Sequence, residues 1–415
     1  TYSPAYLELG NALGQQGKWT AAIATYEQLI QQDPTNALAY SYLGSALEQT
    51  HKMAEAIAAY IKAIRLNSQE TRAYTLLGKL LYRRGRFTEA IEVYNRAIQA
   101  MYPPGSIFKM AQALIGLQEG VITINTGFPC DKSLVGCHNH PAASDIKRAV
   151  QFSCNPYFFR ATQRIIQQGK SRSIFKDSEL GLRKWTEYMH EFGFGVDLGV
   201  DIPSLKKGFI PTVEFYDKYY GKGRWAFSTI YSISIGQGEV LVVPLQMANF
   251  TAHIANRGYY YTPHFVKGID SIGNIPEKFR EKHQMRINRE YYDPLVEGMR
   301  AVVEEPGGTA SSARLKDITV CGKTGTAQNP HGEDHSVFIA FAPMDKPKIA
   351  ISVYVENAGF GGVWAAPIAS LMIEKYLKGS VTDTLKEQRM MNAVILDVKK
   401  DKATTNAKSR KRLGI

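Results

Sequence analysis

A period of 34 residues runs through the first hundred residues and strictly limits how they can fold. The recurring residues are Tyr6, Tyr40 and Tyr74; Leu9, Leu43 and Leu77; Gly10, Gly44 and Gly78; Ala22, Ala56 and Ala90; and Tyr26, Tyr60 and Tyr94. A repeat of this length holds a pair of helices, in which small residues let the helices approach and aromatic side chains fill the gap. Pro34 breaks the chain between the first two units. The pattern predicts helix pairs at 3–36, 37–70 and 71–100, with these tyrosines and leucines in the core.

This pattern resembles the tetratricopeptide repeat (TPR). The resemblance implies an all-α superhelix whose concave face binds a protein or peptide, which the sequence does not identify. The alternative is a plain helical bundle with coincidental spacing. The pattern ends near Ala100 and a different kind of sequence begins at Met101 without a Gly/Ser linker. We therefore expect a domain boundary there, as in a natural or engineered fusion.

Three short motifs carry the chemistry of the second part: Ser106-Ile107-Phe108-Lys109, Ser153-Cys154-Asn155 and Lys323-Thr324-Gly325-Thr326. In this order they form the S-x-x-K, S-x-N and K-T-G set of serine acyl-transfer enzymes. Residues three apart on a helix share a face, so Lys109 can bring its amine to the Ser106 hydroxyl. A serine needs an adjacent base, and a lysine serves when burial or another cation lowers its pKa. We predict Ser106 as the nucleophile and Lys109 as its base.

The other two motifs complete the predicted site. Lys323 is the second cation, and Ser153 relays a proton between the two amines. Asn155, Thr324, Gly325 and Thr326 bind the substrate: residues 320–327 are predicted as a strand, and Gly325 leaves its surface bare for an extended peptide. The backbone N–H groups of Ser106 and Thr326 are the expected oxyanion donors. The alternative is that a buried serine, a capping serine and a surface lysine occur together by chance.

The residues around these motifs resemble class B penicillin-binding proteins, especially those of the penicillin-binding protein 2 type. The resemblance covers about residues 102–377 and rests on four stretches besides the motifs. They are Tyr102-Pro103-Pro104-Gly105, Ser234 to Glu239, Val243 to Ala248, and Phe338 to Pro343. It implies an α/β (α+β) transpeptidase or β-lactamase-like fold over residues 101–378, with an antiparallel sheet flanked by helices. Relatives also carry a membrane helix, a pedestal domain and sheet strands before the nucleophile, so we expect this sheet to lack its usual N-terminal strands.

The resemblance also implies the reaction. The serine attacks the D-Ala-D-Ala bond of a peptidoglycan stem peptide, and an amine of a neighbouring stem resolves the acyl-enzyme; β-lactams acylate the same serine. Implied partners are stem peptides, β-lactams and cell-wall elongation proteins, on the periplasmic side of the inner membrane. Two alternatives stay open: an interaction protein whose truncated catalytic part is inert, and a D,D-carboxypeptidase.

Three of the four cysteines fall within 25 residues of one another. Cys130, Cys137, His140 and Cys154 offer four donors suited to a tetrahedral structural zinc, with His138 as the next choice of histidine. The resemblance to the penicillin-binding protein 2 group also implies a zinc site at this place. The alternatives are a Cys130–Cys137 disulfide and free thiols. Catalysis itself requires no cofactor.

The net charge of +12 is uneven, with nine basic and four acidic residues from Gly379 to Ile415. We expect residues 379–415 to be a basic, disordered tail that is solvated and has no partner. The alternative is attraction to anionic lipid or wall polymer, and no motif indicates nucleic-acid binding. No signal peptide or apolar run of membrane-spanning length is visible. We expect helices on both sides of the Ser153-Cys154-Asn155 turn, strands at 337–341 and 348–356, and a closing helix at 366–377. His331 and His335 are interpreted as loop residues.

Overall fold

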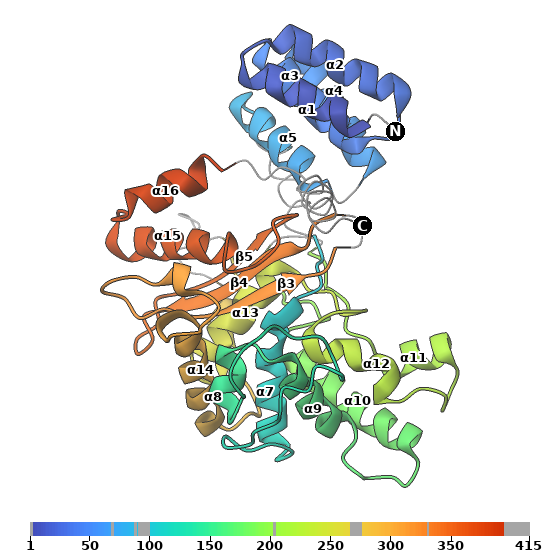
Figure 1. Ribbon diagram of the computed structural model, residues 1–415, viewed down its shortest axis with the longest axis vertical. Coiled ribbons are helices and arrows are strands. Elements are labelled where there is room, and N and C mark those ends of the chain that lie inside the picture. The colour runs from blue at the N-terminus through green and yellow to red at the C-terminus, as the bar shows by residue number, and fades with distance from the viewer. Residues whose placement is uncertain are drawn as a thin grey trace, which may run out of the picture. The chain divides into compact units, whose positions relative to one another are not determined.

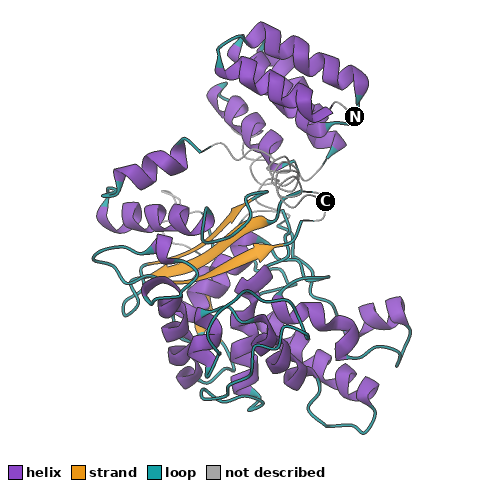
Figure 2. Cartoon of the chain, in the orientation of Figure 1, coloured by secondary structure: helices purple, strands orange, loops and turns teal. Residues whose placement is uncertain are grey.

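The computed structural model describes residues 3–67, 70–86, 89, 100–201, 205–265, 276–329 and 332–393. The chain divides into two compact units, residues 1–100 and 101–415. Figure 1 traces the elements of each unit along the chain, and Figure 2 separates the helical first unit from the second, which contains the strands.

The first unit is a run of helices that pack on one another in sequence order. They are α1 (Ser3–Gln15), α2 (Trp19–Gln32), α3 (Ala37–Gln49), α4 (Met53–Leu66) and α5 (Thr71–Arg83). A Cβ at Gly10 would lie 2.3 Å from the Tyr26 ring, and a Cβ at Gly44 would lie 2.6 Å from the Tyr60 ring. The glycines therefore make room for the tyrosines of the next helix, as the 34-residue period predicts.

One core prediction in this unit is wrong. Leu43 and Leu77 are buried, but Leu9 is 53% exposed. Each repeat covers the one after it, and α1 has no earlier repeat against it within the described residues. Most of the segment predicted as the second helix of the third repeat, including Ala90 and Tyr94, lies outside the described residues.

The second unit holds the remaining elements. Before the main sheet these are η1 (Gly105–Phe108), α7 (Lys109–Gln118), α8 (Ile146–Gln151), α9 (Asn155–Ile166), α10 (Ile174–Glu191), α11 (Val213–Tyr220), α12 (Phe227–Ile230), η2 (Tyr231–Ile235), α13 (Pro244–Ala255), β1 (Tyr259–Tyr261), η3 (Glu277–Phe279), β2 (Lys282–Gln284), η4 (Arg289–Tyr291), α14 (Tyr292–Glu304) and η5 (Ser311–Ala313). The sheet and its closing helices are β3 (Cys321–Ala327), β4 (His335–Ala342), β5 (Ile349–Val355), α15 (Ala365–Lys378) and α16 (Thr384–Met391).

The main sheet has the antiparallel order β3-β4-β5. In the described part of the chain it has three strands, and β3 carries the Lys323-Thr324-Gly325 motif at one edge. α15 packs on one face of the sheet, while α13 and α14 pack on the other (Figure 1). Both faces are covered, so β4 is apolar and buried along almost its whole length. The predicted antiparallel sheet flanked by helices is confirmed.

Helices on both sides of the Ser-Cys-Asn turn are also confirmed. Asp145 caps α8 by accepting from the Arg148 N–H at 2.7 Å, and Pro156 occupies the first turn of α9. Tyr157 and Phe158 are fully buried beneath this turn. The turn therefore stands on a rigid core.

Two further predictions need correction. His335 is the first residue of β4 and pairs with Ala327, so it is not a loop residue; His331 lies outside the described residues. The predicted tail contains the helix α16, which begins at an Asp383 cap. The nearly fully buried Glu374 of α15 accepts from the Thr382 hydroxyl at 2.6 Å and holds the preceding turn.

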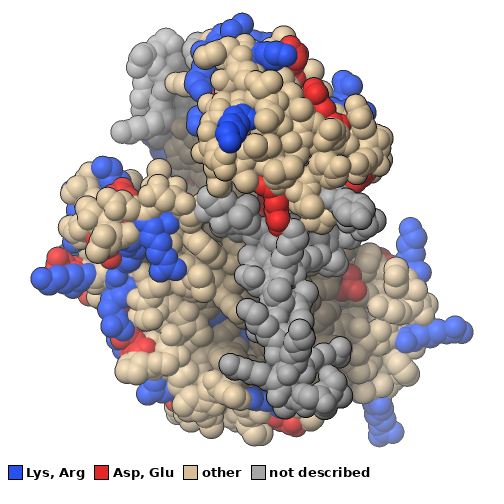
Figure 3. Space-filling view, turned by 45° about the horizontal axis from the view of Figure 1, so that its top comes forward, with Lys and Arg blue, Asp and Glu red and all other residues tan. Residues whose placement is uncertain are grey.

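Residues 394–415 of the predicted tail lie outside the described part of the chain. Lys and Arg side chains gather around α15 and α16 on the face drawn in Figure 3. None of the helices in the described residues combines the length and apolarity needed to span a bilayer.

Candidate active site

The nucleophile motif begins in the short helix η1, which lies directly against β3. Gly105 has a φ of +57°, and a Cβ there would lie 2.4 Å from the carbonyl oxygen of Thr326. Only glycine allows this turn and this close approach. Ser106 is therefore held beside the Lys323–Thr326 strand, as predicted.

Gly325 has a packing role that was not predicted. A Cβ there would lie 3.0 Å from Ile107 and 3.1 Å from the Pro104 carbonyl oxygen, so this side of the residue faces the nucleophile turn. The missing side chain lets the nucleophile turn pack onto β3. Gly325 thus contributes to the site by bringing the two motifs together.

Lys109 is fully buried one helical turn after the nucleophile. Its amine donates to the Ser153 carbonyl oxygen at 2.8 Å, to Ser153 Oγ at 3.2 Å and to Asn155 Oδ1. These hydrogen bonds go to the second motif and not to Ser106. Burial lowers the pKa of Lys109 to about 8, while the Cys137 thiolate opposes the shift. A sizeable fraction of this amine is therefore neutral near physiological pH, as a general base requires.

Lys323 approaches Ser153 from the opposite side. It is also fully buried, and its amine donates to Ser153 Oγ at 2.8 Å and to the Thr324 carbonyl oxygen at 2.8 Å. Burial, and then the charge of Lys109, lowers its pKa well below the usual value. Two ammonium ions cannot share this site cheaply, because each would lose its hydration. The Ser153 hydroxyl therefore lies between two amines whose lowered pKa values favour the neutral form.

Ser153 adopts a left-handed backbone conformation with a φ of 52°. Such a conformation costs a serine roughly 1 kcal/mol and persists only where the surroundings enforce it. Here α8 ends just before Ser153 and α9 begins at Asn155. The strained turn aims the Ser153 side chain at both lysines.

The Asn155 side chain connects the site to the cysteine segment. Its Nδ2 donates to the Gly136 carbonyl oxygen at 2.6 Å, and its Oδ1 accepts from Lys109. The backbone N–H of Asn155 donates to Cys137 Sγ at 3.4 Å. A conformation imposed on residues 130–154 would therefore also fix Asn155, which is predicted to bind the substrate.

The four predicted metal ligands lie together. The ligand atoms of Cys130, Cys137, His140 and Cys154 all lie within 4.8 Å of one another. His140 Nε2 is 3.4 Å from Cys130 Sγ and 3.3 Å from Cys137 Sγ. A tetrahedral zinc would place nitrogen and sulfur ligands about 3.6 Å apart, so the donor set fits the ion.

The surroundings of His140 support the same ligand set. His140 Nδ1 lies 2.6 Å from the Pro141 carbonyl oxygen, so Nδ1–H donates there and Nε2 keeps its lone pair for a metal. All four cysteines are unpaired in the structure. His138 does not belong to the cluster.

Two residues that complete the site were not identified as functional. Gln237 Nε2 donates to the Thr326 carbonyl oxygen at 3.0 Å, and the Thr309 and Thr324 hydroxyl oxygens lie 2.6 Å apart. Gln237 lies in the Ser234 to Glu239 stretch that resembles the family. Its contact with Thr326, which is 89 residues away, has no signal in the sequence. Thr309 follows a Pro-Gly-Gly turn after α14, which signals the end of a helix and not a contact with β3.

This fold and site define a class: proteins in which a helix-borne serine meets S-x-N and K-T-G segments around two buried lysines. Comparison with known families agrees. The family model described as "Penicillin binding protein transpeptidase domain" matches residues 20–374, and a tetratricopeptide repeat model matches residues 3–36. The first match begins inside the repeat unit, ahead of the structural boundary at Met101. The chain belongs to the penicillin-binding protein transpeptidase family.

Individual relatives are consistent with this membership. The chain is 31% identical to the peptidoglycan D,D-transpeptidase MrdA of Acinetobacter baumannii, over 68% of this chain and 43% of that protein. It is also 31% identical to MrdA of Haemophilus influenzae, over 67% of this chain and 45% of that protein. The chain thus spans less than half the length of these curated relatives.

Solved structures give the same fold. The structure of Pseudomonas aeruginosa PBP2 in complex with WCK 5153 matches with a TM-score of 0.57 and 27% identity, over 68% of this chain and 61% of that one. The complex of PBP2 and MreC from Helicobacter pylori matches with a TM-score of 0.53 and 29% identity, over 67% of this chain and 51% of that one. The penicillin-binding protein 2 type of transpeptidase fold is therefore confirmed.

Proposed function

We propose that this chain is a peptidoglycan D,D-transpeptidase that cross-links stem peptides through an acyl-enzyme on Ser106. The observation that carries the proposal is the Ser153 hydroxyl, which joins the fully buried amines of Lys109 and Lys323 beside the nucleophile turn. This arrangement supplies a neutral amine as base and a second amine to return the proton.

Each residue has a defined task in the reaction. Neutral Lys109 takes the Ser106 hydroxyl proton as Ser106 Oγ bonds to the carbonyl carbon of the penultimate D-alanine. The proton passes through Ser153 and Lys323 to the leaving D-alanine amine as the peptide bond breaks. An amine of a second stem then attacks the ester, and its proton returns to Ser106 as the new amide forms. Asn155, Thr324 and Thr326 orient the donor peptide and its carboxylate.

A direct assay tests this reaction. Purified chain incubated with a donor ending in D-Ala-D-Ala and an acceptor amine should release D-alanine and form the donor–acceptor amide, and Ser106→Ala should do neither. D-Alanine release without amide would instead identify a carboxypeptidase. Absence of both from folded protein would contradict the proposal and favour an interaction protein.

We further propose that Cys130, Cys137, His140 and Cys154 hold a structural zinc. The clustering of the four ligand atoms supports it. When bound, zinc would fix the geometry of the 130–154 segment, and Asn155 and Gly136 would share that order. Metal analysis should find about one zinc per chain. Cys130→Ser should lose the zinc and lower the melting temperature, whereas His138→Ala should retain it.

We propose cell-wall proteins as partners of this chain, and the complex of a related PBP2 with MreC supports this proposal. From the family resemblance we further propose that the chain acts beside elongation proteins on the periplasmic side of the inner membrane. The repeat unit would add a docking site for a protein or peptide. Capture from a membrane extract by residues 1–100, compared with a Gly10→Trp variant, tests the docking role.

A further inference from the structure

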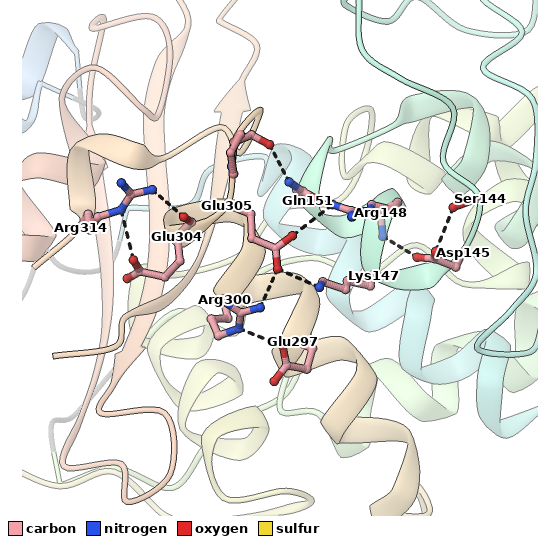
Figure 4. A network of polar contacts seen from close by, with 11 residues as sticks. Ser144, Asp145, Lys147, Arg148, Gln151, Glu297, Arg300, Glu304, Glu305 and Arg314 are labelled. Atoms are coloured by element: carbon pink, nitrogen blue, oxygen red, sulfur yellow. Dashed lines mark hydrogen bonds and ion pairs between the residues drawn. The ribbon is translucent and has the colours of Figure 1, made fainter.

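A single carboxylate, Glu305, connects the helix before Ser153 to the turn that contacts β3 (Figure 4). Glu305 follows the last residue of α14. Its Oε1 lies 2.8 Å from Lys147 Nζ, and its Oε2 lies 3.1 Å from Arg148 Nη1. Both basic residues belong to α8, which leads directly into Ser153. The ion pairs therefore attach α8 to the end of α14.

The same turn makes further contacts with α8. Gln151 Nε2 donates to the Pro306 carbonyl oxygen at 3.0 Å. A Cβ at Gly307 would lie 3.3 Å from the Phe152 ring, so the glycine allows the turn to pack against the residue before Ser153. The attachment thus extends along the C-terminal half of α8.

The turn continues to the K-T-G strand on its other side. Gly308 N–H donates to the Glu305 carbonyl oxygen at 3.1 Å, and Ala310 N–H donates to Val302 at 3.0 Å. This folded turn places the Thr309 hydroxyl 2.6 Å from the Thr324 hydroxyl. One short segment therefore contacts both walls of the site, the Ser153 segment and the Lys323-Thr324 strand.

We propose that Glu305 is a positioning residue that fixes Ser153 relative to Lys323. Its charge holds α8 through two cations, Lys147 and Arg148. Arg300 of α14 also pairs with it, with Nη2 2.6 Å from Glu305 Oε1. These pairs are partly exposed, so each adds little to the stability of the fold. A displacement of about 1 Å in a catalytic constellation, in contrast, costs on the order of a hundredfold in rate. Loss of Glu305 should therefore slow acylation much more than it weakens folding.

Glu297 offers a matched control. It lies on α14, which ends just before Glu305, and it pairs with the same Arg300 at 2.9 Å. Among the described residues it has no ion pair with α8. Glu305→Gln and Glu297→Gln each remove one charge of the network with little change in shape. Both variants should melt within a few degrees of the wild type.

The kinetic test measures acylation by a fluorescent penicillin at a temperature well below melting. Glu305→Gln should lower the limiting acylation rate roughly tenfold, with the half-saturating concentration within about twofold of wild type, and Glu305→Asp should recover part of the rate. Glu297→Gln should acylate like the wild type.

Lys147→Gln should also slow acylation. Adding it to Glu305→Gln should cause little further loss, because both substitutions act through one contact. Equal rates for the two glutamine variants, or multiplying effects of Lys147→Gln and Glu305→Gln, would overturn the proposal.

A second readout does not depend on the proposed acyl transfer, on which the kinetic test rests. Amide hydrogen exchange of peptides covering residues 146–156 should increase in Glu305→Gln and stay at the wild-type level in Glu297→Gln. Unchanged exchange in Glu305→Gln would overturn the proposal. A wild-type protein that is not acylated at all would contradict the proposed function, while exchange would still decide the role of Glu305.

Discussion

The hydroxyl of Ser153 can be removed in two ways that separate its chemistry from its backbone strain. Ser153→Ala deletes the hydroxyl and keeps a side chain in the left-handed conformation at φ 52°. Ser153→Gly deletes the hydroxyl and also removes the steric cost of that conformation. If the hydroxyl acts as a proton relay, both variants should be equally impaired although they differ in stability.

The hydrogen bonds of Ser153 determine how much stability each variant should lose. Lys109 and Lys323 donate to Ser153 Oγ at 3.2 and 2.8 Å, and each keeps a carbonyl acceptor after the hydroxyl is lost. The free energy of unfolding should therefore fall by about 1–2 kcal/mol in Ser153→Ala. Ser153→Gly should recover about 1 kcal/mol of that loss through relief of strain. Acylation should slow by about 10²–10⁴-fold in both variants, as expected for loss of a proton-transfer group.

Stopped-flow measurement of β-lactam acylation, combined with urea unfolding, gives both quantities. Ser370→Ala is a control for loss of a buried hydroxyl, because Ser370 Oγ donates to the Pro367 carbonyl oxygen at 2.9 Å within α15. It should cost a similar free energy of unfolding and leave acylation unchanged. Acylation that is restored in Ser153→Gly would show that the turn conformation matters and the hydroxyl does not.

Three other expectations test separate parts of the account. Acylation needs neutral Lys109, and burial lowers the pKa of this amine to about 8. The acylation rate should therefore rise with pH with a midpoint near 8, and at pH 7 it should be about tenfold below the plateau. A midpoint near the ordinary lysine value would contradict the assignment of Lys109 as the base. Burial lowers the pKa of His253 to about 3, so the neutral imidazole's contribution to the free energy of unfolding is fully present above pH 6.5. This contribution should fall as the pH drops toward 3, by about 2 kcal/mol at pH 5. Urea unfolding at several pH values should show a smaller loss in His253→Gln. Gly44→Ala would place a methyl group 2.6 Å from the Tyr60 ring and should lower the unfolding free energy of the repeat unit by about 1–3 kcal/mol, measured by the circular dichroism melt; an unchanged melt would refute the packing role of the glycine.

The features predicted correctly from the sequence are those with local spacing. The 34-residue period places Gly10 opposite Tyr26 and Gly44 opposite Tyr60. The alternation in residues 348–356 predicts a strand, and the structure has β5 there (Ile349–Val355). Each of these signals lies within one element or one repeat. No long-range contact is needed to interpret them.

The features that were missed depend on contacts between distant segments. α10 was not recognised, because Gly181 and many charges interrupt its apolar pattern; the glycine is required since a Cβ would lie 2.1 Å from the Ile166 carbonyl oxygen. The packing of Gly325 against Pro104 and Ile107 was missed because those residues are more than two hundred positions earlier. The contact of Glu305 with Arg148 of α8 spans 157 residues and also carries no local signal.

The most direct test of the central claim is the site of β-lactam attachment. Intact mass spectrometry of the purified chain after incubation with a penicillin should show one adduct per molecule, and digestion should place it on Ser106. Ser106→Ala should carry no adduct, and Lys109→Ala should form it far more slowly. An adduct on any other residue, or none on correctly folded protein, would contradict a nucleophile activated by the two buried amines.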